Sequence, residues 1–346
     1  MLSRIRRPRL DPLIVLILLA VLLAALLPVR GEAATVFSVA TKLAIALLFF
    51  VYGARLSPTE ALAGLRHWRL HTAILAFTYV VFPLIGVALM PFEHLFPTGL
   101  FLGIVYLTLV PSTVQSSVAF TSIARGNVAG AIISASASNL LGVVLTPILV
   151  MLLMSQGGHV HVSGQVFLDI AVQLLLPFLL GQLARPWIRS IVSHSATKII
   201  DRGSITMVVY SAFSAGMEEG IWSRVTPLDL IGVVLFSVVL VAFMLWLTRF
   251  GAQRLGFNRA DTLAIQFCGT KKSLATGLPM AAVIFGTGEL GLLILPLMIF
   301  HQIQLMMCAA LASHYAAGKP ESEPVAGRLT EPDAPPDSPP FPGGFT

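Results

Sequence analysis

Residues 260–285 read ADTLAIQFCGTKKSLATGLPMAAVIF, an apolar stretch with two adjacent lysines, Lys271 and Lys272, at its middle. The runs on either side have about ten residues each, too few to cross a bilayer alone. Read as one segment, the stretch is long enough to span. We therefore predict a transmembrane helix broken near Gly269 to Ser273, with two ammonium groups at membrane depth. The alternative, in which the lysines lie in a loop on one side of the membrane, stays open.

The composition agrees with a membrane protein. The chain has 346 residues, of which 56% are hydrophobic and only 11% charged, whereas soluble domains carry about 25% charged residues. We predict an all-α integral membrane fold with ten spans, because a span needs about 20 mostly apolar residues. The ten apolar runs cover about residues 12–29, 36–56, 69–91, 98–123, 127–154, 165–185, 197–217, 228–250, 259–285 and 289–315.

The basic residues support this count and give an orientation. Alternate loops place 17 of the 22 Lys and Arg residues on one side and only Arg30 and Arg224 on the other, while Lys42 and the lysine pair fall inside spans. Because basic loops stay in the cytoplasm, we predict a multi-pass protein of the plasma (inner) membrane with both termini cytoplasmic. The basic start of the chain reads as the flank of a retained first helix rather than a cleaved signal peptide.

Ten spans divide into two halves of five, and an odd number per half reverses the orientation of the second half. This pattern predicts an inverted repeat. The two repeats would cover about residues 12–155 and 164–316, within a transmembrane domain of residues 1–317. Residues 318–346 are rich in Pro, Glu, Asp and Gly, so we predict a disordered cytoplasmic tail.

The fourth segment of the first half is interrupted at the position that matches the lysine pair. Residues 99–124 read GLFLGIVYLTLVPSTVQSSVAFTSIA, and proline removes a backbone donor and breaks helices. Polar backbone and side chains at this depth occur where they face protein or a cavity. We predict a substrate or ion site at the two breaks, formed by Ser112, Thr113, Gln115, Ser116, Ser117, Thr270, Lys271, Lys272 and Ser273.

The lysines indicate the charge of the ligand. A lysine at the centre of a span costs about 2.5–3.5 kcal/mol on insertion scales, so two would face the protein interior, a wet cavity or an acidic partner. A half-helix that begins nearby adds the positive end of its dipole. Cations and a helix N-terminus together favour an anion such as a carboxylate, sulfate or phosphate.

Other polar residues in spans give weaker signals. Asn139 in the fifth span is a further predicted residue of the substrate or ion site, although small polar residues such as the serines of this span more often mediate close helix packing. His301 in the tenth span is a candidate for a proton relay, with structural hydrogen bonding as the alternative. We predict no metal site, because His159 and His161 alone do not make one. The two cysteines imply no disulfide framework.

The sequence lacks the signatures of common enzymes and of nucleic-acid binding. We find no HExxH, GxSxG, P-loop or Rossmann glycine pattern, so we predict a protein that is not an enzyme and is driven by gradients rather than ATP. The net charge of +6 comes from scattered residues, not from one basic face, so we expect no nucleic-acid partner.

Four stretches resemble the bile acid:sodium symporter family: FFVYGARLSP (49–58), PSTVQSSVAFTSIARGN (111–127), IARGNVAGAIISASASNLLGVVLTP (123–147) and FCGTKKSLATGLPMA (267–281). The resemblance, strongest to the sodium–bile acid symporter-like subgroup, covers about residues 12–316. It implies two inverted five-helix repeats with broken helices four and nine crossing at the centre. It also implies a core domain of helices 3–5 and 8–10 that moves against a panel domain of helices 1, 2, 6 and 7.

One departure from this family changes the expected coupling. Sodium-coupled members are expected to hold sodium with a glutamate and a glutamine in the broken ninth helix, whereas here Phe267 to Lys272 contains no acid. Ala131 and Ala135 stand where hydroxyl ligands are expected early in the fifth helix. An ammonium group can take the place of a sodium ion, so we predict a protein that does not use the usual sodium sites. Proton coupling would then involve a buried lysine that gains and loses a proton.

These observations predict a secondary transporter, symporter-like, that carries small organic anions by alternating access in the lipid bilayer. It needs no cofactor, and Na⁺ or H⁺ is the candidate coupling ion. The alternative is a membrane regulator or scaffold that keeps the fold without transport. The sequence leaves open the substrate, the oligomeric state and which lysine faces the cavity.

Overall fold

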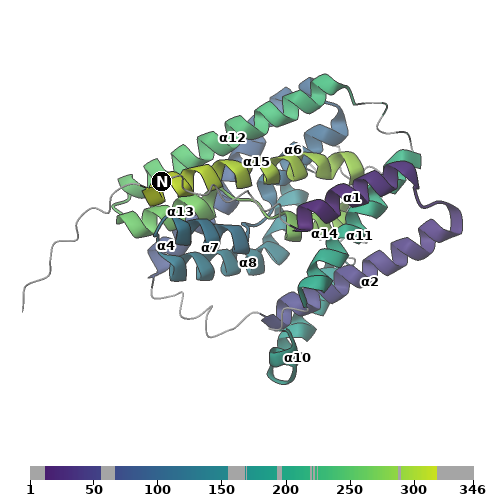
Figure 1. The fold of residues 1–346 in the computed structure, drawn as a ribbon, viewed down its shortest axis with the longest axis horizontal. Coiled ribbons are helices and arrows are strands. Elements are labelled where there is room, and N and C mark those ends of the chain that lie inside the picture. Colours follow the sequence, from purple (N-terminus) through teal and green to yellow (C-terminus); the bar gives the residue numbers. More distant parts are fainter. Residues whose placement is uncertain are drawn as a thin grey trace, which may run out of the picture.

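The computed structural model describes residues 12–55, 67–154, 168, 170–192, 197–218, 220, 223, 225–286 and 290–317, and every regular element in these ranges is helical (Figure 1). The predicted tail of residues 318–346 and the histidines His159 and His161 lie outside the described residues. The elements are α1 (Pro12–Leu26), α2 (Gly31–Arg55), α4 (Trp68–Ala76), η2 (Phe77–Val81), α5 (Phe82–Leu89), η3 (Met90–Leu95), α6 (Thr98–Leu109), α7 (Val114–Ile123), α8 (Val128–Met154), η4 (Ala171–Leu175), α10 (Leu176–Val192), α11 (Thr197–Glu218), α12 (Pro227–Arg254), α13 (Arg259–Thr270), α14 (Leu274–Phe285) and α15 (Leu290–Ala317).

The described residues of each of the ten predicted segments are mainly helical, but not all of these segments qualify as spans by length and composition. In the described part of the chain, six helices are long and apolar enough to cross a membrane, namely Gly31–Arg55, Trp68–Leu95, Val128–Met154, Ala171–Ile188, Pro227–Arg254 and Leu290–Ala317. The pair α6 and α7, bent by 61°, makes a seventh if it is one span. The protein is therefore a multi-pass membrane protein whose described part is helical, and the number ten and the inverted repeat stay predictions.

The helices form two groups, which Figure 1 shows on opposite sides of the molecule. In one group, α2 packs against α10 and α11, and α1 packs against α11. The other group contains α4 to α8 and α12 to α15, and its contacts include α15 with α6 and α13 with α12. Contacts of α11 with α14 and α15 join the groups. The family resemblance assigns these two sets of helices to a panel domain and a core domain, and this assignment stays a prediction.

Two glycines bring the backbones of α2 and α10 close together. A Cβ atom at Gly53 would lie 2.0 Å from the carbonyl oxygen of Phe178, and one at Gly181 would lie 2.0 Å from that of Phe50. Small residues allow such close approach between membrane helices. A side chain at either position would push the two helices apart.

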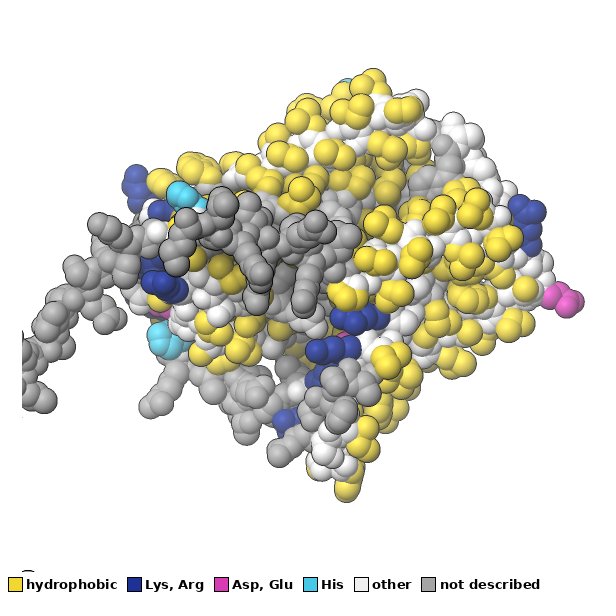
Figure 2. Space-filling model, in the orientation of Figure 1, with side chains coloured by type: hydrophobic (Ala, Val, Ile, Leu, Met, Phe, Trp, Pro, Cys, Tyr) yellow, Lys and Arg dark blue, Asp and Glu magenta, His cyan; other side chains and the backbone are white. Residues whose placement is uncertain are grey.

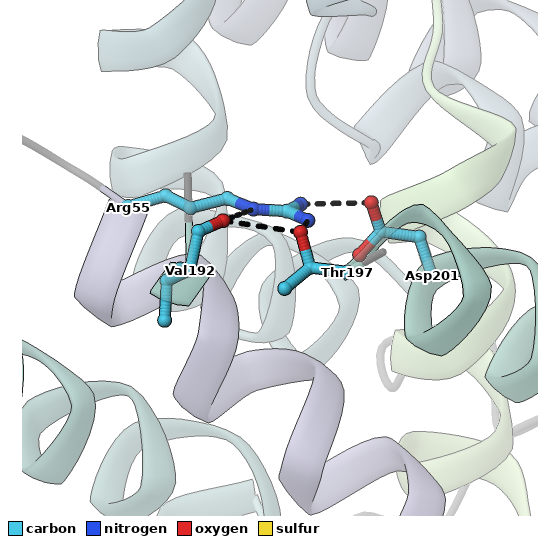
Figure 3. Close-up of polar contacts among 4 residues, drawn as sticks. All are labelled: Arg55, Val192, Thr197 and Asp201. Atoms are coloured by element: carbon cyan, nitrogen blue, oxygen red, sulfur yellow. Dashed lines mark hydrogen bonds and ion pairs between the residues drawn. The ribbon is translucent and has the colours of Figure 1, made fainter. Parts of the chain in front are cut away.

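A guanidinium joins three helix ends in this same group (Figure 3). Arg55, the last residue of α2, donates from Nη1 to Asp201 Oδ2 at 2.7 Å and from Nε to the carbonyl oxygen of Val192 at 3.4 Å, and its Nη2 donates to Thr197 Oγ1. Val192 ends α10 and Thr197 begins α11. A cation near the C-terminal carbonyls of α2 and α10 complements their dipoles, so Arg55 fixes the ends of three helices relative to one another.

The outer surface is apolar over wide areas, as Figure 2 shows for one face. Large side chains there are well exposed, including Leu26 (69%), Trp187 (78%) and Leu228 (76%). Soluble proteins rarely expose large contiguous apolar patches. This surface is suited to lipid.

Candidate functional site

Two helix breaks meet at the centre of the larger group. The first lies between α6 and α7, and the second between α13 and α14. The backbone N–H of Ser273 donates to the carbonyl oxygen of Pro111 at 2.7 Å, and Ser112 Oγ donates to that of Cys268 at 2.6 Å. Thr113 Oγ1 donates to the carbonyl oxygen of Lys272 at 2.9 Å. Both predicted interruptions are present, and each break supplies hydrogen-bonding partners to the other.

Local sequence explains where the helices stop. Pro111 cannot donate to the preceding turn, and Val110 before it is extended, with φ −77° and ψ 156°. At the second break Lys271 is also extended, with φ −90° and ψ 150°. Ser273 then caps α14, because its side chain accepts from the N–H of Thr276. Serine is a preferred residue at this position.

The carbonyl groups freed by the first break are paired with other elements, as buried backbone groups must be. The partners are Lys272 Nζ for Thr108 and Val110, Thr146 Oγ1 for Leu109, Ser273 N for Pro111, and Asn139 Nδ2 for Ser112. The break is thus built from side chains of α8 and from the second break. Two of the five carbonyls depend on one lysine.

The ammonium group of Lys272 is enclosed by backbone oxygens. Its Nζ donates to the carbonyl oxygens of Thr78 at 3.0 Å, Thr108 at 2.8 Å and Val110 at 2.9 Å, and lies 4.1 Å from the centre of the Phe82 ring. Lys272 is fully buried. We call these three carbonyls and the ring the Lys272 cage. An ammonium has three donors, and here all three are used.

The Thr78 carbonyl is available because of an irregularity in the third segment. It lies in η2, a π-helical turn in which the N–H of Phe82 donates to the carbonyl oxygen of Phe77. In this register the carbonyl of Thr78 would accept from residue 83, but Pro83 has no N–H. Such π turns often occur at functional sites. Lys272 supplies the donor that Pro83 cannot.

Lys271 has different surroundings. It is also fully buried, but its Nζ has no hydrogen-bond partner among the described residues and lies 3.8 Å from the centre of the Phe120 ring on α7. The ion pairs of the described ranges are Arg30 with Glu218 and Arg55 with Asp201, so neither lysine is paired with an acid there. Ser116, one turn before Phe120, has a buried Oγ without a partner in the same ranges.

Gln304 of α15 fixes the backbone of Lys272. Its Oε1 accepts from the N–H of Lys272 at 2.9 Å, and its Nε2 donates to the carbonyl oxygen of Lys272 at 2.8 Å. His301 Nδ1 lies 2.8 Å from Gln304 Nε2 and 3.4 Å from the same carbonyl oxygen. His301, the candidate for a proton relay, thus contacts the backbone of the second break rather than a lysine side chain. Sequence reasoning did not assign Gln304 to the site; the signal was its position three residues after His301, on the same helix face.

Most of the remaining predicted residues lie near the two breaks, and one lies at the surface. Asn139 Oδ1 accepts from Thr276 Oγ1 at 2.6 Å, which links α8 to α14, and Thr270 Oγ1 lies 3.2 Å from Thr248 Oγ1. Ser117 Oγ donates to the carbonyl oxygen of Phe267 at 3.3 Å. Gln115, in contrast, is exposed. All the predicted residues except Gln115 have buried or half-buried side chains.

Comparison with known proteins gives the same family as the quoted sequence stretches. Residues 11–317 match the SBF-like CPA transporter family. A protein of Escherichia coli named "Putative symporter YfeH" is 48% identical over 315 residues, which cover 88% of this chain and 93% of that protein. An uncharacterised protein of Pseudomonas aeruginosa is 49% identical over 315 residues, covering 90% and 95%.

Animal proteins also match over most of the chain. Sodium/bile acid cotransporter 7 of Mus musculus is 30% identical over 282 residues, which cover 78% of this chain and 81% of that protein. The family match spans all the described helices. The chain therefore belongs to the SBF-like CPA transporter family, a family of membrane transporters within the bile acid:sodium symporter group that its sequence resembles.

Proposed function

We propose that this protein is a secondary transporter of small organic anions that works by alternating access, with the ammonium group of Lys271 as the charge that binds the anion. The observation that carries this proposal is the position of Lys271 Nζ, which is fully buried where the two helix breaks meet and has no hydrogen-bond partner in the described ranges. Binding sites of secondary transporters lie where such helices meet.

Electrostatics favours an anion at this position. A buried ammonium without a counter-charge costs several kcal/mol, and contact with an aromatic ring returns only about 0.5–2 kcal/mol. An anion beside Nζ would remove most of that cost. The N-terminus of α14, a 12-residue helix that begins at Leu274, adds a favourable dipole. The half-buried Ser116 hydroxyl is a further donor for the ligand.

We assign the binding of the anion to the ammonium group of Lys271 and not to that of Lys272. The three donors of Lys272 are already used by carbonyls of the protein. We infer that transport does not depend on sodium at this crossing, and that Lys271 exchanges a proton as the anion binds and leaves. His301, next to Gln304 and the carbonyl of Lys272, is the candidate route for that proton.

The membrane topology of the protein is a separate part of the proposal. We propose that the protein lies in the plasma membrane with ten spans in two inverted repeats and with both termini in the cytoplasm. We also propose that the group of α4 to α8 and α12 to α15 moves against the group of α1, α2, α10 and α11 during transport. The strongly uneven distribution of basic residues supports this orientation. Single cysteines at Arg30 and Arg125, labelled from outside intact cells in a variant with serine at Cys268 and Cys308, test it: only the first should react.

The function is tested with purified protein and three probe anions: taurocholate, benzoate and p-nitrophenyl sulfate. At least one should raise the midpoint of thermal unfolding and enter proteoliposomes. Lys271→Gln should abolish both effects, and Lys271→Arg should retain binding in part. Lys42→Gln is the matched control, because Lys42 is an exposed lysine of α2, away from the crossing. Binding that survives in Lys271→Gln would contradict the role of Lys271.

The coupling ion is tested by the gradient. Uptake should be the same with inward sodium and inward choline gradients, and should change when the pH difference across the membrane is reversed. Strong dependence on sodium would contradict the inference that the usual sodium sites are not used.

A further inference from the structure

The Lys272 cage has the composition of a site for a monovalent cation. Its oxygens are the carbonyls of Thr78, Thr108 and Val110, which contact Nζ at 2.8–3.0 Å. Rings of backbone carbonyls replace the hydration shell of small cations in ion-selective proteins, and unwound backbone and half-helix C-termini coordinate cations in transporters. Thr108 and Val110 lie at the C-terminal end of α6, where the helix dipole favours positive charge.

The fourth wall of the cage is also suited to a cation. The Phe82 ring lies 4.1 Å from Nζ, within the range in which the face of an aromatic ring attracts positive charge. No carboxylate of the described residues forms an ion pair with Lys272. Three neutral oxygens and one ring fit a charge of one better than a charge of two, because divalent ions need anionic ligands.

A lysine that only capped the end of one helix would not need carbonyls from two separate segments and an aromatic ring around its ammonium group. The three carbonyls come from two segments separated by about 30 residues, and one of them is free only because η2 is π-helical and is followed by Pro83. The end of α6, the π turn and Pro83 each remove an N–H donor that a continuous helix would supply to these carbonyls. Together they leave three unpaired acceptors directed at one point, which is the arrangement a free cation requires.

We propose that the Lys272 cage is a monovalent-cation site whose cation is supplied by the protein itself, as the tethered ammonium of Lys272. A tethered ammonium cannot diffuse away, so this site stays occupied in every state of the protein without an ion from solution. Truncating the side chain exposes a site that binds small ammonium ions or alkali cations. This inference needs no anion to be bound or transported, and therefore stands or fails separately from the proposed function.

The test is chemical rescue of Lys272→Ala in purified protein. Propylammonium has the three carbons and the nitrogen that this substitution removes. Without the amine the variant should unfold well below the unmodified protein, and tens of millimolar propylammonium chloride should raise its unfolding midpoint by about 3 °C or more, since a ligand of the native state stabilises it. Ammonium and potassium chloride should act more weakly, and choline chloride, too large for the cage, should have no effect.

Two controls separate a cation site from a simple cavity. Propan-1-ol has nearly the shape of propylammonium but no charge, and it should not rescue Lys272→Ala. Lys271→Ala removes the same atoms next to an aromatic ring but without carbonyl ligands, and propylammonium should leave its midpoint unchanged. Equal rescue by the alcohol, or equal rescue of both variants, overturns the proposal.

If Lys272→Ala is too unstable to purify, the yield of folded protein is the measurement. Cells are lysed and membranes are solubilised with propylammonium chloride or with choline chloride, and the monodisperse fraction is compared between the two salts. A several-fold higher yield with propylammonium supports the cation site. No gain in either the midpoint or the yield overturns it.

Discussion

Lys271 and Lys272 are adjacent in sequence and equally buried, yet the surroundings of their ammonium groups differ. Lys272 Nζ donates to three carbonyls, whereas Lys271 Nζ lies beside an aromatic ring and has no hydrogen-bond partner in the described part of the chain. The extended backbone at Lys271 explains the difference, because successive side chains of an extended chain point to opposite sides. Two adjacent lysines in a helix break therefore do not have the same role. The ammonium group of Lys272 binds carbonyls of the protein, whereas that of Lys271 is available to a ligand.

The largest effect that this comparison predicts is on stability. Lys272→Met keeps most of the apolar stem but removes the charge, and leaves the carbonyls of Thr78, Thr108 and Val110 buried without donors. We expect a loss of about 3–5 kcal/mol in the free energy of unfolding, because each buried acceptor left without a donor costs about 1–3 kcal/mol. Thermal or denaturant unfolding in detergent measures it. A variant as stable as the unmodified protein would remove the distinction between the lysines.

The next effect concerns Gln304, which contacts the backbone of Lys272 with both ends of its amide. Gln304→Leu has a similar size but removes both hydrogen bonds and leaves the buried N–H of Lys272 without an acceptor, while the carbonyl oxygen of Lys272 keeps the hydrogen bond from Thr113 Oγ1. We expect a loss of about 2–3 kcal/mol, somewhat less than for Lys272→Met. Gln302→Leu is the matched control two residues away on α15. An equal loss in the control would show that the amide position is not special.

The same unfolding assay should give the opposite sign for the other lysine. Lys271→Met removes an ammonium with no partner in the described ranges and adds apolar volume next to Phe120. Replacing buried ions by apolar side chains is often stabilising, and we expect a gain of about 1–2 kcal/mol together with loss of anion binding. A clear loss of stability would mean that Lys271 has a structural partner.

The sequence predicted the breaks well, because their causes are local. Pro111 and the lysine pair interrupt otherwise apolar runs at matching places, and the structure confirms both interruptions. It did not predict how the lysines divide, because that depends on which carbonyls α6 and η2 leave free. The π turn and the consequence of Pro83 appear only once the register is known. The exposed position of Gln115 likewise depends on how α7 packs, which helix periodicity in an all-apolar environment does not fix.

The smallest predicted effect tests whether Pro83 and Lys272 serve the same carbonyl. In the unmodified protein, Pro83→Ala adds a donor that the Thr78 carbonyl does not need, so stability should change little. In the Lys272→Met background the new N–H can pair with that carbonyl without any change of helix register, and should restore about 0.5–1 kcal/mol. The double-mutant cycle measures this coupling from unfolding midpoints. Additive effects would show that the lysine does not replace the donor missing from residue 83, and that the carbonyl of Thr78 is satisfied in another way when Lys272 is removed.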